Sequence, residues 1–196
     1  MKFCLIAFLF SLYSSIINAQ QIPKNKVIKF SIGRVAFGTG DVFGYSFSSE
    51  LSKNLKRHIN FGFEATVENG KVQPKLSDVL TAFNQVSNAC LTPKINFYPF
   101  NKVIKGFNIG IGPTLGYQFK TEESQWTFLY DSNGNPFLRR SVLKYTNEFF
   151  IGYRISLNYD LNFQKGFLLG IRSDFSSYNN GDINTLIAVK TGFSFR

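Results

Sequence analysis

The sequence is poor in the residues from which most enzyme and metal sites are built. Among its 196 residues there are one histidine and two cysteines, and charged side chains make up 17%. A single histidine leaves little material for a zinc site or for a histidine-based catalytic triad. Beyond the N-terminus, no apolar run approaches the roughly 18 residues of a membrane-spanning helix, which excludes a helical membrane protein.

The first 19 residues predict a cleavable secretory signal. Lys2 gives a positive start, residues 3–13 are mostly apolar, and the segment closes with the small residue Ala19. We expect cleavage after Ala19, so that residues 20–196 form one mature domain. That domain keeps only Cys90, which excludes an intramolecular disulfide. The alternative for residues 1–19 is a short buried helix.

Aromatic residues are abundant, with 23 phenylalanines and 9 tyrosines, and these residues favour strands. Apolar side chains alternate with polar or small ones in five segments, at 59–67, 107–119, 149–159, 167–175 and 187–195. Alternation with a period of two predicts strands that have two different faces. A set of eight strands is completed by three weaker segments, at 26–37, 43–51 and 91–100.

Alternation alone leaves open which face lies inside the barrel. A soluble lipocalin-like barrel encloses its apolar face, whereas a membrane barrel turns that face to lipid. The polar face here is rich in glycine, which suits a cramped interior. Connections alternate between short ones, as at 101–106, and long ones, as at 68–90 and 120–144. The sequence therefore predicts an all-β fold: an eight-stranded antiparallel up-and-down transmembrane β-barrel with short periplasmic turns and longer extracellular loops.

The first segment breaks its alternation at Arg34. Ile32 sets the apolar face, and continued alternation would put Arg34 on that face. We predict a β-bulge at Gly33 and Arg34 that turns Arg34 inward and returns Val35 and Phe37 to the apolar face. The alternative is an Arg34 side chain that extends to the membrane interface.

The charged residues on the polar face are expected inside the barrel. An eight-stranded barrel has an interior just wide enough for side chains to fill, and an unpaired charge buried there is very costly. We therefore expect an internal ion-pair network that plugs the lumen, in preference to a gated ion path. Its members are Lys29, Glu50, Glu64, Lys94, Arg154, Arg172, Asp174 and Lys190.

The longest expected loop, 120–144, is the candidate contact site for an extracellular protein partner. Trp126, Phe128 and Tyr130 alternate there, and Phe137 resumes the pattern after a dense turn signal. We expect the flanking strands to continue beyond the membrane as a hairpin whose edges accept a partner's strand. The alternative is that these aromatic side chains pack on one another or lie at the level of the lipopolysaccharide headgroups.

Basic residues are in excess, with a formal net charge of +10. On the predicted topology the periplasmic side holds nine lysines and arginines and one acidic residue, Asp160. This charge is suited to anionic headgroups of the inner leaflet. No aromatic–basic motif accompanies it, so we expect membrane lipids and no nucleic acid as partners.

The mature chain resembles the small eight-stranded outer-membrane β-barrels of the OmpA/OmpX-like group, especially those common in Bacteroidota. The resemblance rests on the residues Asn18 to Gln21 at the end of the signal, on the alternating glycine and aromatic strands, and on the closing strand from Leu186 to Arg196. It implies location in the outer membrane of a Gram-negative bacterium, contact with lipopolysaccharide, and recognition by the barrel assembly machinery. The closing strand departs from the usual signal, because Phe195 is penultimate and Arg196 follows.

These observations predict a porin-like outer-membrane barrel with a structural or surface-binding, adhesive role, and without catalysis, cofactor or metal. One alternative is a lipid A-modifying barrel enzyme. For that chemistry the sequence offers only His58, which lies beside a predicted periplasmic turn, away from lipid A. The other alternative is a soluble, lipocalin-like carrier of a small hydrophobic ligand.

Overall fold

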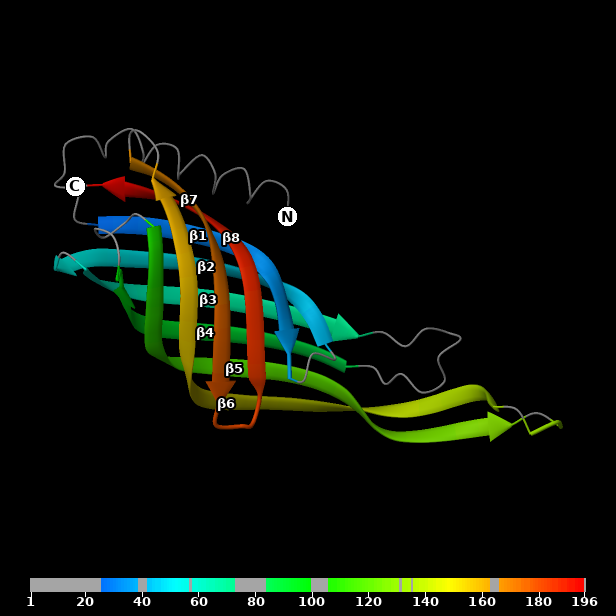
Figure 1. Cartoon of the computed structure of the whole chain (residues 1–196). Helices are drawn as coiled ribbons and strands as arrows, with labels where there is room; N and C mark the ends of the chain where they lie inside the picture. The colour runs from blue at the N-terminus through cyan, green and yellow to red at the C-terminus, as the bar shows by residue number, and fades with distance from the viewer. Residues whose placement is uncertain are drawn as a thin grey trace, which may run out of the picture.

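The protein is a closed barrel of eight antiparallel strands. The computed structural model describes residues 26–38, 42–56, 58–72, 84–99, 106–130, 132–134, 136–162 and 166–195. In chain order the strands are β1 (Lys26–Phe37), β2 (Val42–Lys56), β3 (Ile59–Val72), β4 (Asn84–Phe97), β5 (Gly106–Tyr130), β6 (Pro136–Asn162), β7 (Phe167–Tyr178) and β8 (Ile183–Phe195). Each strand pairs with the next along the chain, and β8 pairs with β1 (Figure 1). The predicted eight-stranded antiparallel barrel is confirmed.

The two ends of the barrel differ in their connections. Lys26 pairs with Phe195, so the first and last strands begin and finish at one end, called here the terminus end. The other, the loop end, holds the β1–β2, β3–β4, β5–β6 and β7–β8 connections. Residues 73–83 in the second of these, and the predicted signal at 1–19, lie outside the described residues. Among the described residues, no helix is long and apolar enough to cross a membrane.

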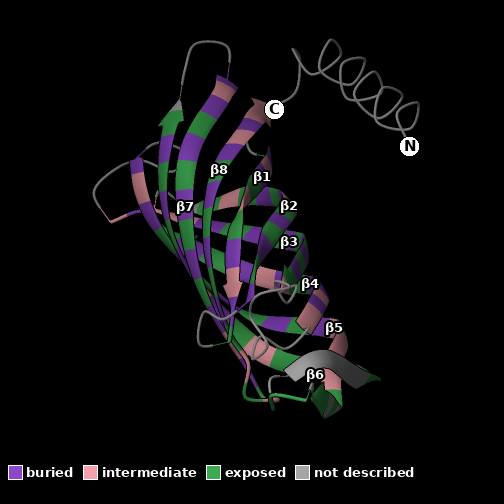
Figure 2. Ribbon diagram, turned by 90° about the vertical axis from the view of Figure 1, so that its right-hand side faces the viewer, coloured by how far each residue is buried: buried purple, intermediate pink, exposed green. Residues whose placement is uncertain are grey.

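In the barrel wall, buried and exposed residues alternate along each strand (Figure 2). The large apolar side chains are mainly on the exposed face. Phe149 is 83% exposed and Ile187 is 72% exposed, whereas polar residues such as Asn60 and Thr114 are fully buried. A soluble barrel has the opposite arrangement, because water favours a polar exterior. The apolar face is therefore on the outside, as the glycine-rich polar face predicted.

Aromatic side chains on the outward face lie near both ends of the barrel. At the loop end, the ring of Tyr117 lies edge-on to Phe149, with 4.7 Å between centroids, and to Phe119, with 4.8 Å. At the terminus end, the Phe167 and Phe193 rings are 5.4 Å apart. Membrane barrels have aromatic girdles of this kind at the two bilayer interfaces.

The predicted bulge at Gly33 and Arg34 is wrong. The β1–β2 and β1–β8 registers run through this point without a shift, and Arg34 pairs with Tyr45. Arg34 stays on the outward face, with its guanidinium carbon 5.0 Å from the centre of the Tyr45 ring. Val35 and Phe37 point into the barrel instead, where burial of their apolar surface outweighs the cost of one exposed arginine. They form a cluster with Val42, Val86, Leu186 and Ala188.

Glycine makes room for a large side chain inside the barrel. Phe150 is buried in the lumen, packed against Tyr178 and Cys90. Gly116 lies directly opposite Phe150 on β5, and a Cβ atom at this position would run into the phenyl ring. The absence of a side chain at Gly116 therefore lets the ring occupy the lumen.

We expect Gly116→Val to lower the free energy of unfolding by about 1–3 kcal/mol, because it overpacks the site beside Phe150. Urea titration of the protein refolded in detergent micelles measures the change. Phe150→Leu should cost less in the Gly116→Val background than in the wild type, since a smaller side chain relieves the clash. Strictly additive effects of the two substitutions would contradict this packing.

Candidate functional site

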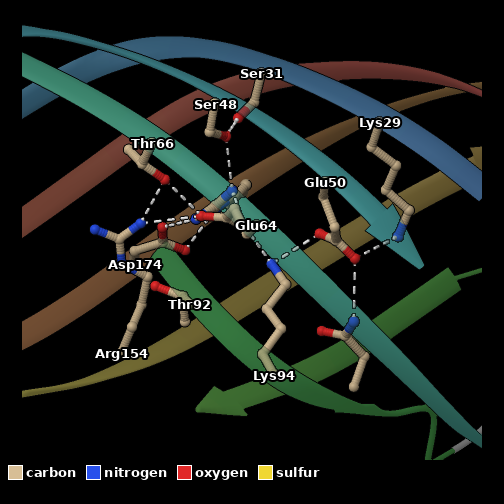
Figure 3. A network of polar contacts seen from close by, with 12 residues as sticks. Lys29, Ser31, Ser48, Glu50, Glu64, Thr66, Thr92, Lys94, Arg154 and Asp174 are labelled. Carbon is tan, nitrogen blue, oxygen red and sulfur yellow. Dashed lines mark hydrogen bonds and ion pairs between the residues drawn. The ribbon is translucent and has the colours of Figure 1, made fainter. Parts of the chain in front are cut away.

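Glu64 is the centre of a polar network inside the barrel (Figure 3). Its carboxylate is fully buried and lies 2.5 Å from Lys94 Nζ and 2.9 Å from Arg154 Nη1. Arg172 donates to both carboxylate oxygens, at 2.6 and 2.8 Å. Thr66 donates a further hydrogen bond at 2.9 Å. Three cations, carried by β4, β6 and β7, therefore share one anion carried by β3.

A chain of ion pairs runs from this centre toward the terminus end. Lys94 also contacts Glu50, at 2.8 Å, so its ammonium bridges two carboxylates. Figure 3 shows Glu50 between Lys94 and Lys29, and the Lys29 ammonium is 3.9 Å from Glu50 and 3.4 Å from Asp160. Lys190 closes the chain with a 2.6 Å contact to Asp160.

The network also extends from its centre toward the loop end. Arg154 reaches past Glu64 to Glu68, at 3.0 Å. Glu68 in turn accepts hydrogen bonds from Asn88, at 3.3 Å, and from Asn184, at 2.8 Å. Beside the centre, Arg172 is ion-paired with Asp174 on the same strand. The buried carboxylates are therefore held by cations and by amide donors from several strands.

Among the described residues, the buried positive and negative charges of the lumen are equal in number. There are five cations and five anions: Lys29, Lys94, Arg154, Arg172 and Lys190, with Glu50, Glu64, Glu68, Asp160 and Asp174. The structure brings all eight sequence-predicted residues into contact with one another or with the two that were missed. The two missed residues, Glu68 and Asp160, supply the negative charge that the predicted set lacks.

Asp160 and Glu68 were misplaced because the predicted strands were too short. Asp160 was expected on the periplasmic rim, but β6 continues to Asn162 and Asp160 is 1% exposed inside the barrel. Glu68 was counted in a loop, but β3 continues to Val72. If the two-residue alternation is continued by one step, from Asn158 to Asp160 and from Thr66 to Glu68, it predicts that both acidic side chains point into the barrel.

Apolar side chains occupy the lumen on both sides of the ionic centre. Toward the loop end lies the cluster around Val35 and Phe37. Toward the terminus end, Val27 packs against Leu168. The described interior is thus filled by side chains, as an eight-stranded barrel allows.

The β5–β6 hairpin continues well past its neighbours (Figure 1). The pairing of β4 with β5 ends at Glu122, and the pairing of β7 with β6 begins at Gly152. Beyond these points β5 and β6 pair only with each other among the described strands, as far as Tyr130 and Pro136. The register shifts at Ser124, where β5 leaves the barrel. We call residues 123–143 the ribbon.

The ribbon contains the aromatic residues that the sequence singled out as a contact site. Tyr130 is 60% exposed near its tip. The backbones of Trp126, Phe128 and Phe137 lie in β5 and β6, but their side chains lie outside the described residues. The predicted hairpin is present, and the part played by these side chains stays a prediction.

The single histidine, His58, stabilises a turn. His58 Nδ1–H donates to the Tyr98 carbonyl oxygen at 2.9 Å, and the Tyr98 amide donates to the His58 carbonyl at 2.9 Å. These two bonds tie the β2–β3 turn to the chain just after β4, at the terminus end. Across the described chain, no group of three or more histidine, cysteine, aspartate or glutamate residues is arranged to hold a metal ion.

Comparison with solved structures places the chain among barrels of the same fold. Ail, the attachment invasion locus protein of Yersinia pestis, matches with a TM-score of 0.50 and 8% identity, over 87% of this chain and 99% of that chain. Neisserial surface protein A matches with a TM-score of 0.49 and 9% identity, over 90% of this chain and 100% of that chain. No protein-family model and no curated protein matches the sequence. The likeness to Ail shows the fold, that of small outer-membrane barrels.

Proposed function

We propose that this protein is an integral outer-membrane barrel of a Gram-negative bacterium that binds a protein partner at the cell surface through its ribbon. The observation that carries the proposal is the ribbon itself, a two-stranded extension whose outer edges pair with no other described strand. In this proposal the barrel is the anchor and the ribbon is the contact site.

Several features support the membrane location. The exposed apolar face and the aromatic side chains at both ends suit a bilayer. Export through a signal cleaved after Ala19, assembly by the barrel assembly machinery and the Bacteroidota affiliation rest on the sequence alone. With this topology the terminus end faces the periplasm, and the loop end faces lipopolysaccharide and the exterior.

A closed lumen is the second part of the proposal. The neutral ion-pair network and the apolar clusters at its two sides fill the described interior. Moving an ion through it would require breaking buried ion pairs, which is strongly unfavourable. The network thus acts as a structural plug, and the protein is no open diffusion channel.

The open edges of the ribbon suit recognition by strand addition. An edge strand presents unpaired N–H and C=O groups, and natural proteins usually protect such edges from other chains. On β5 the open edge covers residues 124–129, and on β6 it covers residues 136–150. An extended segment of a partner gains main-chain hydrogen bonds at such an edge, while its side chains set specificity.

Trimming the ribbon should abolish adhesion while leaving the barrel folded. Glu122 pairs with Lys144, so an Asn-Gly turn between them in place of residues 123–143 makes a two-residue hairpin. We expect Gram-negative host cells that display the wild-type protein to adhere to immobilised extracellular-matrix proteins or to epithelial cells, and cells that display the trimmed variant not to adhere.

The matched control keeps the ribbon and changes two of its exposed apolar side chains, as Leu129→Ser and Val142→Ser. Because strand addition depends on the backbone, this control should retain adhesion. Equal adhesion of wild-type and trimmed cells on every surface would refute the ribbon as the contact site. Loss of adhesion in the serine variant would show that side chains, and not strand edges, are recognised.

The two alternatives receive no support from the geometry. His58 is committed to the Tyr98 backbone at the terminus end, remote from the leaflet where lipid A lies in the proposed topology. The described lumen is lined mainly by polar and charged side chains that pair with one another, a lining that does not suit a hydrophobic ligand. We therefore propose a binding role without catalysis or cofactor.

A further inference from the structure

A groove of about 460 Å³ crosses the outward face of the barrel on β6, β7, β8, β1 and β2. Ligand sites typically enclose about 300–1,000 Å³. The groove runs across the strands, along rows of residues that pair with one another. In one row the small Ala36 pairs with the large Phe43, and Phe175 lies two strands away on the other side of Ala36. In the next row the small Ser173 pairs with the larger Ile187. The hollow in the barrel wall therefore arises from the size pattern of its side chains.

Among the described residues that line this groove, Arg34 is the one cation. It lies in the half of β1 nearer the loop end, next to Ile187 of β8. Its guanidinium lies over the Tyr45 ring, and no carboxylate in the described part of the chain pairs with it. A charge on the lipid-facing surface is unfavourable, by an amount that falls from about 2–4 kcal/mol at the midplane to about 0–1 near the interface. An anion from the lipid itself would compensate it.

We propose that this groove binds a phosphorylated lipid of the outer leaflet, lipid A, with a phosphate on Arg34 and an acyl chain along the groove. A guanidinium matches phosphate oxygens in a bidentate, charge-assisted contact. The apolar walls formed by Phe43, Phe175 and Ile187 match an acyl chain. Because the groove lies on the lipid-facing wall, lipid A reaches it from within the leaflet. This inference rests on the proposed membrane topology.

The test is native mass spectrometry of the refolded protein in micelles, titrated with bisphosphorylated lipid A and with the same lipid A lacking its phosphates. We expect Arg34→Gln to weaken binding of the bisphosphorylated form about tenfold or more, because a charge-assisted contact is lost. Ser173→Trp, which fills the groove without changing charge, should weaken both forms. Lys53→Gln, the same kind of change on the outward face at the terminus end, should leave binding unchanged.

The outcomes distinguish a failure of the proposed lipid A site from a failure of the proposed membrane location. Each variant is first checked for insertion into liposomes, by the heat-dependent shift of folded barrels on SDS gels. If the wild-type protein fails to insert, the membrane location and the lipid site are both overturned. If it inserts and Arg34→Gln or Ser173→Trp binds lipid A like the wild type, only the site is overturned. Equal binding of phosphatidylglycerol would overturn the assignment to lipid A.

Discussion

Glu64→Gln should lower the free energy of unfolding by about 3–5 kcal/mol, because it leaves buried cations without their shared anion. Lys94, Arg154 and Arg172 all contact the Glu64 carboxylate at 2.5 to 2.9 Å. The substitution removes one of the five buried negative charges and leaves the described lumen with a net positive charge. The glutamine amide would also direct a donor at groups that are themselves donors.

Urea titration in micelles measures this effect, and two further variants bracket it. Glu122→Gln makes the same change in the ion pair with Lys120, whose side chains are 32% and 34% exposed, and should cost less than about 1 kcal/mol. Adding Lys94→Gln to Glu64→Gln restores charge balance and should recover part of the loss, since Glu50 keeps Lys29 nearby. A Glu64→Gln variant as stable as the Glu122→Gln variant would disprove a structural network.

The same proteins test the closed lumen. In planar bilayers we expect no steady, porin-like conductance from the wild type, because the described interior is filled by paired charges and apolar side chains. Steady conductance at porin-like levels would disprove the closed lumen and favour an ion path.

The second large effect concerns the outward face. Ile111 is 56% exposed in the middle of the barrel wall and pairs with Ile95 and Ile155. We expect Ile111→Lys to destabilise the folded protein in liposomes by about 2–4 kcal/mol, because lysine at the bilayer midplane loses its hydration. Folding yield on SDS gels and urea titration in liposomes measure the loss.

Leu161→Lys is the matched control for the outward face. Leu161 is 43% exposed, but it lies next to the last residue of β6, at the terminus end. Lysine there should cost only about 0–1 kcal/mol, since it reaches headgroups and water. If Ile111→Lys is as harmless as Leu161→Lys, or if it makes the protein soluble without detergent, the outward face meets water and the carrier alternative returns.

The sequence predicts the architecture well because the alternation of side chains is a local property. In a strand, successive side chains point to opposite faces, so eight alternating segments indicate eight two-faced strands. Glycine on the polar face indicates which face is inside. Strand ends are harder to predict, because pairing with neighbours decides how far a strand continues; this is why Glu68 and Asp160 were missed.

Arg34 shows where local reasoning fails. The sequence rule that keeps charge off an apolar face predicted a bulge, but the structure keeps an unbroken register. Ladder hydrogen bonds and the burial of Val35 and Phe37 together outweigh the cost of one outward arginine. That balance depends on what lies across the barrel, which no local pattern shows.

The sequence by itself determined the strands, their two faces and most of the charges that the barrel encloses. Only the tertiary structure decided which charges meet. Arg154 and Glu64 are 90 positions apart on strands that are not neighbours in the sheet. They touch because closure of eight strands leaves a lumen narrow enough for one side chain to reach across it. The sequence predicted a hairpin with open edges, but only the register showed its extent, because the pairing of β5 with β4 stops at Glu122 and the pairing of β6 with β7 stops at Gly152.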